Sequence, residues 1–313
     1  MAHAPSLLMH ATETTMTGAV GFIGLGNMGR PMALKLAERG FPLVVHDIAA
    51  AGVEALRAHG AKVADSAEHV AAAADRTVVM VETTAQASAV IAGERGIVHG
   101  ASRGHVVVCM STIDPVVARR LGDALGMRGI ALLDAPVSGG TGRAATGELA
   151  IMAGGARETF DACGDLLAAL GTKIFHVGGL GQGLAMKLVN NMLIQVNMVA
   201  ISEALVMGVK AGLDPRTVYD VVCASAGTSF AFETQVPRML ARDFSPGATV
   251  DVLYKDQELE TAFAKHLGVP LLLANVSQQV YQMARAAGFG KEDGTAILKI
   301  VESLAGIRAL SDT

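Results

Sequence analysis

The sequence predicts an α/β domain with a mostly parallel sheet, followed by an all-α domain that a long interdomain helix joins to it. Three observations favour this fold class. Short apolar runs alternate with alanine-rich helical stretches from residue 18 to about 178, strand-like runs are missing after about residue 180, and one helical pattern covers about Gly183 to Ala211. Alternating strands and helices are typical of parallel sheets with crossover helices.

The predicted strands are apolar runs without alternation, which indicates strands covered on both faces. They are Ala19–Ile23, Leu43–His46, Arg76–Val81, His105–Cys109 and Ile130–Asp134, with Glu148–Ala153 and Thr172–Val177 extending the sheet. Ligands of such sheets bind at the carboxyl ends of the strands. In the second half, Asp214 and Pro215 predict the start of a further helix, as its cap and its first residue.

A glycine-rich turn follows the first predicted strand. Gly24, Gly26 and Gly29 have G-x-G-x-x-G spacing, and a helical pattern follows at once. The glycines allow the turn, the approach of a ligand to the backbone and close helix packing. The amides and the dipole at the helix start favour a diphosphate. The motif therefore predicts a Rossmann-like dinucleotide site rather than a purely structural turn. Its expected cofactor-binding residues are Gly24, Leu25, Gly26, Asn27, Met28 and Gly29.

An acidic residue, Asp47, ends the second predicted strand. A carboxylate about 20 residues after the glycines can accept a hydrogen bond from a ribose 2′-hydroxyl. The same charge repels a 2′-phosphate, and no Arg or Lys follows before Arg57. The sequence therefore favours NAD over NADP.

The composition argues against several function classes. Aromatic residues make up only 4% of the chain and there is no Trp, which suits close helix–sheet packing better than an aromatic-rich β-sandwich. The net charge is -4. No basic field is available to attract nucleic acid or anionic lipid. Cys109, Cys163 and Cys223 lie in apolar runs without metal-ligand spacing, so we expect buried thiols in a reducing compartment and no metal.

The patterns divide the sequence into three regions, two of which are expected to be domains. We expect a disordered extension over residues 1–17 without signal-peptide features, a NAD-binding domain over 18–180 and a helical domain for substrate binding and oligomerisation over 181–308. The apolar run of residues 188–209 is too polar for a membrane span, because several Asn, Gln, Ser and Glu residues interrupt it. We therefore expect a cytoplasmic protein.

Polar residues follow the later strands. Ser111 and Thr112 are candidate site residues, or else only the cap of the helix that Pro115 begins. Ser138, Gly139 and Gly140 predict a nest of amides suited to a carboxylate, with a simple turn as the alternative.

The long helix contains two polar residues of interest, Lys187 and Asn191. They are four residues apart and therefore share one helical face. A solvent-exposed stripe is the simplest interpretation of such a lysine. Its position at the predicted domain boundary favours a functional one, since small ligands often bind between domains.

The glycine loop, Asp134–Gly140 and Gly181–Asn191 resemble the β-hydroxyacid dehydrogenase family, and a later Lys255-Asp256 pair agrees with it. This family includes 3-hydroxyisobutyrate dehydrogenase, tartronate semialdehyde reductase and threonate dehydrogenase. The resemblance spans about residues 18–305. It implies an NAD-dependent oxidoreductase that interconverts a small hydroxy acid and its aldehyde or keto form by hydride transfer, and a homodimer or homotetramer.

The resemblance also implies roles for individual residues. Lys187 would be the general acid/base, and Asn191 would help to hold the substrate. Ser138, Gly139 and Gly140 would bind the substrate carboxylate. The remaining cofactor contacts would come from Val81, Glu82, Thr112 and Lys255, with Thr112 also beside the substrate.

Three departures from the family pattern affect the expected cofactor and substrate contacts. Val81-Glu82 replaces a usual Leu-Pro near the adenosine. Ala248 replaces a common aromatic residue and Gln257 a Leu, which predicts a wider and more polar pocket that suits a sugar-acid-like substrate. Ile194 stands where 6-phosphogluconate dehydrogenases have an acidic residue, so phosphogluconate is disfavoured.

Two other functions remain open at this point. One is an imine or semialdehyde reductase using NADPH, against which Lys187 and Asp47 argue. The other is a non-catalytic protein that only binds a dinucleotide. The sequence leaves open which hydroxy acid is used, its stereochemistry and the favoured direction.

Overall fold

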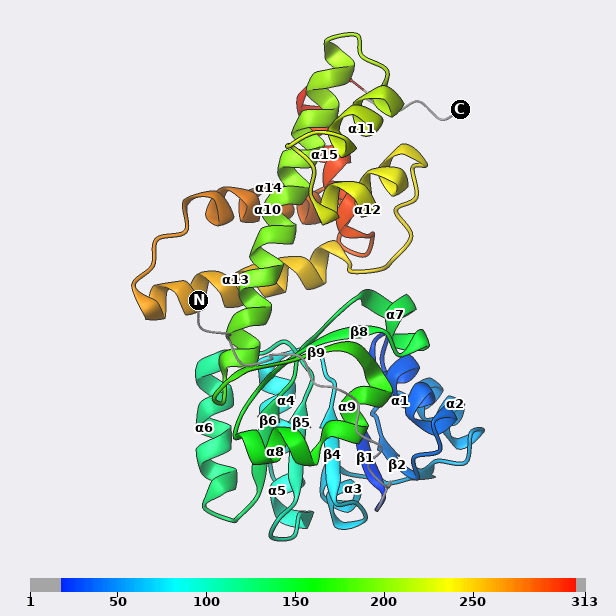
Figure 1. The fold of residues 1–313 in the computed structure, drawn as a ribbon, viewed down its shortest axis with the longest axis vertical. Helices are drawn as coiled ribbons and strands as arrows, with labels where there is room; N and C mark the ends of the chain where they lie inside the picture. The colour runs from blue at the N-terminus through cyan, green and yellow to red at the C-terminus, as the bar shows by residue number, and fades with distance from the viewer. Residues whose placement is uncertain (1–17, 308–313) are drawn as a thin grey trace, which may run out of the picture. The chain divides into compact units, whose positions relative to one another are not determined.

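A computed structural model describes residues 18–307 and contains two compact units. The first unit ends at Lys187 and the second begins at Leu188. Both limits lie inside helix α10 (Gln182–Lys210), which Figure 1 shows in green. The boundary predicted near residue 180 stays a prediction, and the extension predicted over residues 1–17 lies outside the described residues.

The first unit contains a nine-stranded sheet within the described residues. Its strands are β1 (Val20–Ile23), β2 (Leu43–His46), β3 (Lys62–Val63), β4 (Arg76–Val79), β5 (Val106–Cys109), β6 (Ala131–Asp134), β7 (Val137–Ser138), β8 (Leu149–Gly154) and β9 (Gly171–Gly178). Their order is β3-β2-β1-β4-β5-β6-β8-β7, and β9 pairs with β8. All pairs among β1 to β6 are parallel, whereas β8 is antiparallel to β6 and β7. The predicted mostly parallel, Rossmann-like sheet is confirmed.

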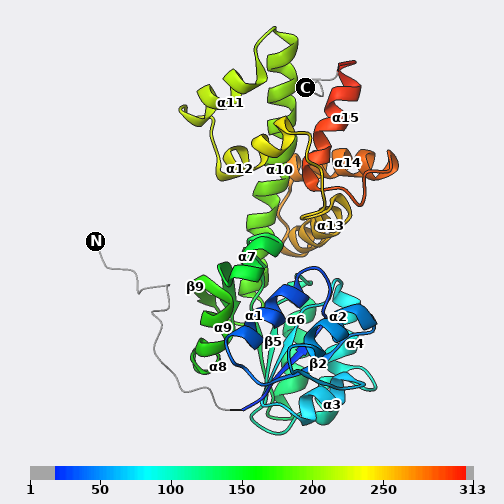
Figure 2. The ribbon, with the colours of Figure 1, turned by 90° about the vertical axis from the view of Figure 1, so that its right-hand side faces the viewer.

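Helices cover both faces of this sheet. One apolar core holds Phe22 and Val45 of the strands, and the other holds the neighbouring Ile23 and Val44, as expected when successive side chains alternate between faces. The first core includes side chains of α1 (Gly29–Glu38), α2 (Ala50–Arg57), α7 (Gly140–Thr146), α8 (Arg157–Ala162) and α9 (Gly164–Leu170). The second includes α3 (Ala67–Ala72), α4 (Thr84–Ala92), α5 (Ile97–Gly100) and α6 (Pro115–Gly126). Figure 2 shows α8 and α9 on one side and α4 on the other.

The observed elements differ from the predicted ones in two respects. Strands β3 and β7 were not predicted, because two residues are too short for a hydrophobic pattern. The alternative that Ser111 or Thr112 caps α6 is wrong. Asp114 caps this helix, since its carboxylate accepts a hydrogen bond from the amide of Val116 at 2.7 Å.

The second unit is helical. Besides most of α10 it contains α11 (Pro215–Cys223), α12 (Phe230–Leu240), α13 (Val250–Leu267), α14 (Leu272–Ala286), the 3₁₀ turn η1 (Gly294–Ala296) and α15 (Ile297–Leu304). Asp214 caps α11 and Pro215 is its first residue, as predicted. The unit packs around a core that includes Leu205, Phe232, Leu253 and Tyr281.

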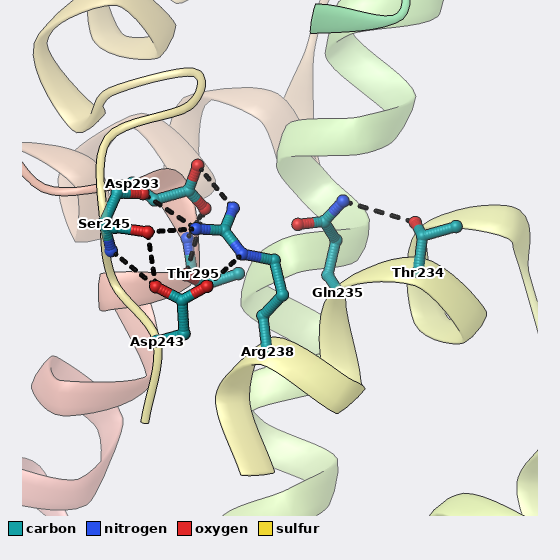
Figure 3. Close-up of polar contacts among 7 residues, drawn as sticks. All are labelled: Thr234, Gln235, Arg238, Asp243, Ser245, Asp293 and Thr295. Atoms are coloured by element: carbon teal, nitrogen blue, oxygen red, sulfur yellow. Dashed lines mark hydrogen bonds and ion pairs between the residues drawn. The ribbon is translucent and has the colours of Figure 1, made fainter. Parts of the chain in front are cut away.

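Arg238 of α12 fixes the loop that leads to α13 (Figure 3). Its guanidinium pairs with Asp293 at 2.9 Å and with Asp243 at 3.3 Å, and it donates a hydrogen bond to the Ser245 carbonyl at 2.7 Å. Asp293 in turn accepts hydrogen bonds from the amide and hydroxyl of Thr295. One side chain therefore joins α12, the loop and the segment around η1.

Helix α10 is the one helix of residues 18–307 that is long and apolar enough to cross a membrane by length and composition alone. Of the residues in its most apolar window, 44% are buried. Its Asn191 and Gln195 are buried and bond to α13. Buried polar groups with partners inside the same unit indicate a core helix.

Candidate active site

The glycine loop between β1 and α1 has the geometry of an anion cradle. Gly24 has φ +93°, and a Cβ on Gly29 would lie 1.8 Å from the Gly24 carbonyl oxygen. A Cβ on Gly26, by contrast, would meet no atom within 4 Å. Gly24 and Gly29 therefore serve the turn itself, while Gly26 leaves the space in front of the loop open.

The start of α1 is also suited to a phosphate group. Met28 stands at the cap position, and no described side chain caps this helix. The first amides of an α-helix have no acceptor within it, and the helix dipole favours negative charge there. The residues around this loop therefore fit the diphosphate of a dinucleotide.

Asp47 lies at the carboxyl end of β2, half-buried beside the glycine loop. Its carboxylate accepts hydrogen bonds from the amides of Leu25 and of Ala49, the latter at 2.7 Å. It thus orders the loop, a role that the sequence did not indicate. Each carboxylate oxygen can accept more than one hydrogen bond, so Asp47 keeps capacity for a ribose hydroxyl.

Ser111 connects the ends of two neighbouring strands. Its hydroxyl accepts a hydrogen bond from the Val81 amide at 2.7 Å, which fixes the backbone after β4. The Glu82 amide donates to Gln86 at 3.0 Å, and Glu82 itself is exposed. Thr112 is half-buried at the end of β5. The candidate cofactor contacts Val81, Glu82 and Thr112 thus lie at the predicted edge of the sheet.

The Ser138-Gly139-Gly140 segment is a strand end followed by two glycines with positive φ. Val137 and Ser138 pair with β8, and Gly139 and Gly140 have φ of +138° and +70°. Ser138 is half-buried, whereas both glycines are exposed. Exposed amides in such conformations suit a carboxylate.

Lys187 and Asn191 lie four residues apart on α10, and Lys187 is half-buried. The Asn191 side chain is only 6% exposed and donates a hydrogen bond to Asp256 of α13 at 2.7 Å. The other oxygen of Asp256 pairs with the Lys255 ammonium at 2.9 Å. The structure therefore brings Asn191 and Lys255, which are distant in sequence, together on one buried carboxylate.

Gln257 and Ala248 are the two replacements on which the polar-pocket interpretation rests. Gln257 is 1% exposed, and its amide donates a hydrogen bond to Ser277 of α14 at 3.1 Å. Ala248 is exposed, and its carbonyl accepts from the Gly294 amide. The Gln257 amide nitrogen thus has its partner inside the helical unit, which weakens one of the two reasons for a sugar-acid-like substrate.

Among the described residues, neither a reactive thiol of Cys109 or Cys163 nor a group of metal ligands contributes to this site. Burial raises the pKa of the Cys109 and Cys163 thiols to about 12, so neither is a thiolate near neutral pH. Among residues 18–307, no group of three or more His, Cys, Asp or Glu side chains is placed to hold a metal ion.

Comparison with known proteins identifies the family. A family model described as the NAD binding domain of 6-phosphogluconate dehydrogenase matches residues 19–178. A second, described as NAD-binding of NADP-dependent 3-hydroxyisobutyrate dehydrogenase, matches residues 181–301. The two models together span nearly the whole described chain.

Individual relatives agree. The chain is 36% identical to 2-(hydroxymethyl)glutarate dehydrogenase of Eubacterium barkeri, over 92% of this chain and 96% of that protein. It is 34% identical to human mitochondrial 3-hydroxyisobutyrate dehydrogenase, over 90% and 86%. A solved structure of the Mycobacterium tuberculosis 3-hydroxyisobutyrate dehydrogenase with L-serine has 30% identity and a TM-score of 0.83, over 91% and 99%. The chain therefore belongs to the β-hydroxyacid dehydrogenase family of NAD(P)-binding oxidoreductases.

Proposed function

We propose that this protein oxidises a small hydroxy acid with NAD, and that the alcohol is a hydroxymethyl group on the carbon beside a carboxylate. The named relatives support this class. The compounds 2-(hydroxymethyl)glutarate, 3-hydroxyisobutyrate and L-serine, which appear in their names, all contain this unit. The reaction converts the alcohol to an aldehyde and NAD to NADH, with release of one proton.

The observation on which this proposal rests is the polar pair on α10. Lys187 precedes the buried Asn191 by four residues on α10, so the two side chains share one helical face. An amine and an amide on one face can contact a single substrate hydroxyl together, the amine as proton acceptor and the amide as hydrogen-bond donor.

Lys187 is the proposed general base of the oxidation. The nicotinamide supplies the acceptor for the hydride that leaves the substrate carbon. A neutral Lys187 amine takes the proton from the substrate hydroxyl, and in the reverse direction the ammonium returns it to the forming alkoxide. Asn191, held by Asp256, offers a fixed amide for the substrate.

The substrate carboxylate is assigned to Ser138, Gly139 and Gly140, and Thr112 to the neighbourhood of substrate and nicotinamide. The exposed, positive-φ glycines support the first assignment. Lys255, fixed by its pair with Asp256, is the proposed cofactor contact from the helical unit. Cofactor binding by the glycine loop and Asp47, a homo-oligomeric assembly and a cytoplasmic location complete the proposal.

Substitution of Lys187 tests the chemistry. We expect Lys187→Ala to lower kcat by about 100-fold or more, because general acid/base catalysis contributes about 10²–10⁴-fold. NADH affinity, measured by fluorescence titration, should stay the same. Lys210→Ala removes a lysine at the far end of the same helix and should leave kcat unchanged. Normal turnover by Lys187→Ala would overturn the proposed mechanism.

A substrate panel tests the substrate class and the alternatives. It contains 3-hydroxyisobutyrate, L-serine, 2-(hydroxymethyl)glutarate, glycerate, tartronate semialdehyde and threonate, each with NAD(H) and NADP(H). The first three should give the highest kcat/KM. Turnover of cyclic imines with NADPH alone would favour the imine reductase, and cofactor binding without any turnover would favour the non-catalytic protein.

A further inference from the structure

Asp134, at the carboxyl end of β6, caps a helix that begins far away in the sequence. One oxygen of its carboxylate accepts a hydrogen bond from the Gly181 amide at 2.7 Å, and the other from the Leu184 amide at 2.7 Å. These partners are 47 and 50 residues further along the chain. The side chain is fully buried. Helix caps usually come from the residue just before the helix, so this one instead joins the sheet to the start of α10.

Two glycines leave the space that this contact needs. A Cβ on Gly183 would lie 2.9 Å from an Asp134 carboxylate oxygen and 2.3 Å from the Met152 carbonyl oxygen of β8. A Cβ on Gly154 would lie 2.6 Å from the Gly183 amide nitrogen and 2.8 Å from the other Asp134 oxygen. The first turn of α10 therefore contacts the backbone of the sheet directly, and any side chain at these positions would push it away.

We propose that Asp134 is a positioning residue for the reaction, which sets the place of Lys187 relative to the cofactor-binding sheet. Lys187 follows the capped Leu184 by three residues, less than one helical turn, so a displacement of the cap moves the amine with it. A misplacement of about 1 Å can lower turnover by about 100-fold. The inference rests on the proposed function of Lys187.

The charge of Asp134 gives this role a pH dependence. Burial raises the pKa of its carboxyl to about 7, although the Gly181 and Leu184 amides act in the opposite direction. The Cys109 thiol of β5 and the Arg119 guanidinium of α6 also face it. Because a protonated carboxyl has a donor in place of one acceptor, the cap weakens as the pH falls below about 7.

The test compares Asp134→Asn with the wild-type protein in the direction of reduction, where Lys187 acts as the ammonium. Asparagine has the same shape but only one acceptor oxygen, so one of the two helix amides loses its partner. We expect kcat to fall about 10–100-fold, while NADH affinity stays unchanged. The wild-type kcat should decline below about pH 7, and Asp134→Asn should lack this decline, which a merely structural role would not predict.

Two further variants complete the experiment. Asp214→Asn makes the same change at the exposed cap of α11 and should leave kcat and its pH profile unchanged. Gly183→Ala keeps the carboxylate but displaces the helix start, and it should lower kcat in the same way. Circular dichroism and NADH binding show whether Asp134→Asn folds. If it does not fold, the kcat of Gly183→Ala tests the inference in its place.

The outcomes separate this inference from the proposed function. A folded Asp134→Asn protein with wild-type kcat and an unchanged pH profile would overturn the inference while Lys187→Ala is still inactive. An active Lys187→Ala protein would overturn the proposed function itself.

Discussion

The Asp47 carboxylate orders the glycine loop and is also the proposed contact for the ribose of the cofactor. It accepts hydrogen bonds from the amides of Leu25 and Ala49, and it stands where a ribose hydroxyl is expected. The two tasks agree, because the same group that orders the glycine loop places a negative charge where a 2′-phosphate would lie. Cofactor preference and loop order should therefore change together when Asp47 is replaced.

We expect Asp47→Ala to weaken NAD binding by about 10-fold or more, because hydrogen bonds to a charged group contribute about 1.5–3 kcal/mol. NADP binding should weaken less, since the repulsion of its 2′-phosphate is lost at the same time. Calorimetric titration with both cofactors measures the two affinities. Asp161→Ala, at an exposed ion pair on α8, is the matched control. An equal loss for NAD and NADP would show that Asp47 acts only through the loop.

Single residues also show how far the sequence alone could lead. Gly24, Gly26, Gly29 and Asp47 were predictable, because their spacing along the chain is itself the signal. The cap by Asp134 was not, since its partners lie 47 and 50 residues away and only the folded first unit brings them together. The Gln257 contact was missed for the same reason, because its partner Ser277 belongs to another helix.

At the scale of elements, the second unit depends on how α12 is joined to the loop before α13 (Figure 3). Arg238 forms ion pairs with Asp243 and Asp293. Along the chain, Asp243 precedes α13, whereas Asp293 follows α14. Hydrogen bonds from Ser245, followed by that from Arg238, lower the pKa of Asp243 to about 2. This carboxylate therefore stays charged at mildly acidic pH, where its contact with Arg238 persists.

Removing the guanidinium should destabilise the helical unit. We expect Arg238→Gln to lower the free energy of unfolding by about 1–3 kcal/mol, because Asp293, which is almost fully buried, loses its ion pair. Arg216→Gln, at an exposed pair with Asp220 on α11, should change it by less than about 0.5 kcal/mol. Urea unfolding followed by circular dichroism compares both variants with the wild-type protein. Equal stabilities of the two variants would contradict this role of Arg238.

Sequence patterns predicted the long elements better than the short ones. The strand over Leu43–His46 and the long helix were predictable because a run of apolar residues or a helical period extends over several positions. The two-residue strands β3 and β7 have no such pattern, and pairing with β2 and β8 alone defines them. The alternative cap of α6 by Ser111 or Thr112 was wrong, and the sequence held a signal against it: Pro115 begins the helix, so Asp114 stands at the cap position, as Asp214 does before Pro215.

At the scale of the whole molecule, we expect the apolar surface of the second unit to be covered by self-association. Five large apolar side chains within ten residues, at the end of α13 and the start of α14, are half or more exposed: Leu267, Val269, Leu272, Leu273 and Val276. Scattered exposed apolar residues need no explanation, whereas large exposed apolar patches mark interaction surfaces, and these five residues are close in sequence. A second copy of the chain fits the homo-oligomer expected from the sequence.

Light scattering after size-exclusion chromatography should give a mass of at least two chains. We expect the double variant Leu272→Glu/Leu273→Glu to lower this mass, because charged residues at the centre of an apolar interface are strongly unfavourable. Both side chains are at least 71% exposed, so the substitutions should leave the fold of one chain intact. Met127→Glu, at an 85% exposed residue of the first unit, is the control and should keep the wild-type mass. A monomeric wild-type protein would contradict the oligomer, and an unchanged mass of the double variant would place its interface elsewhere.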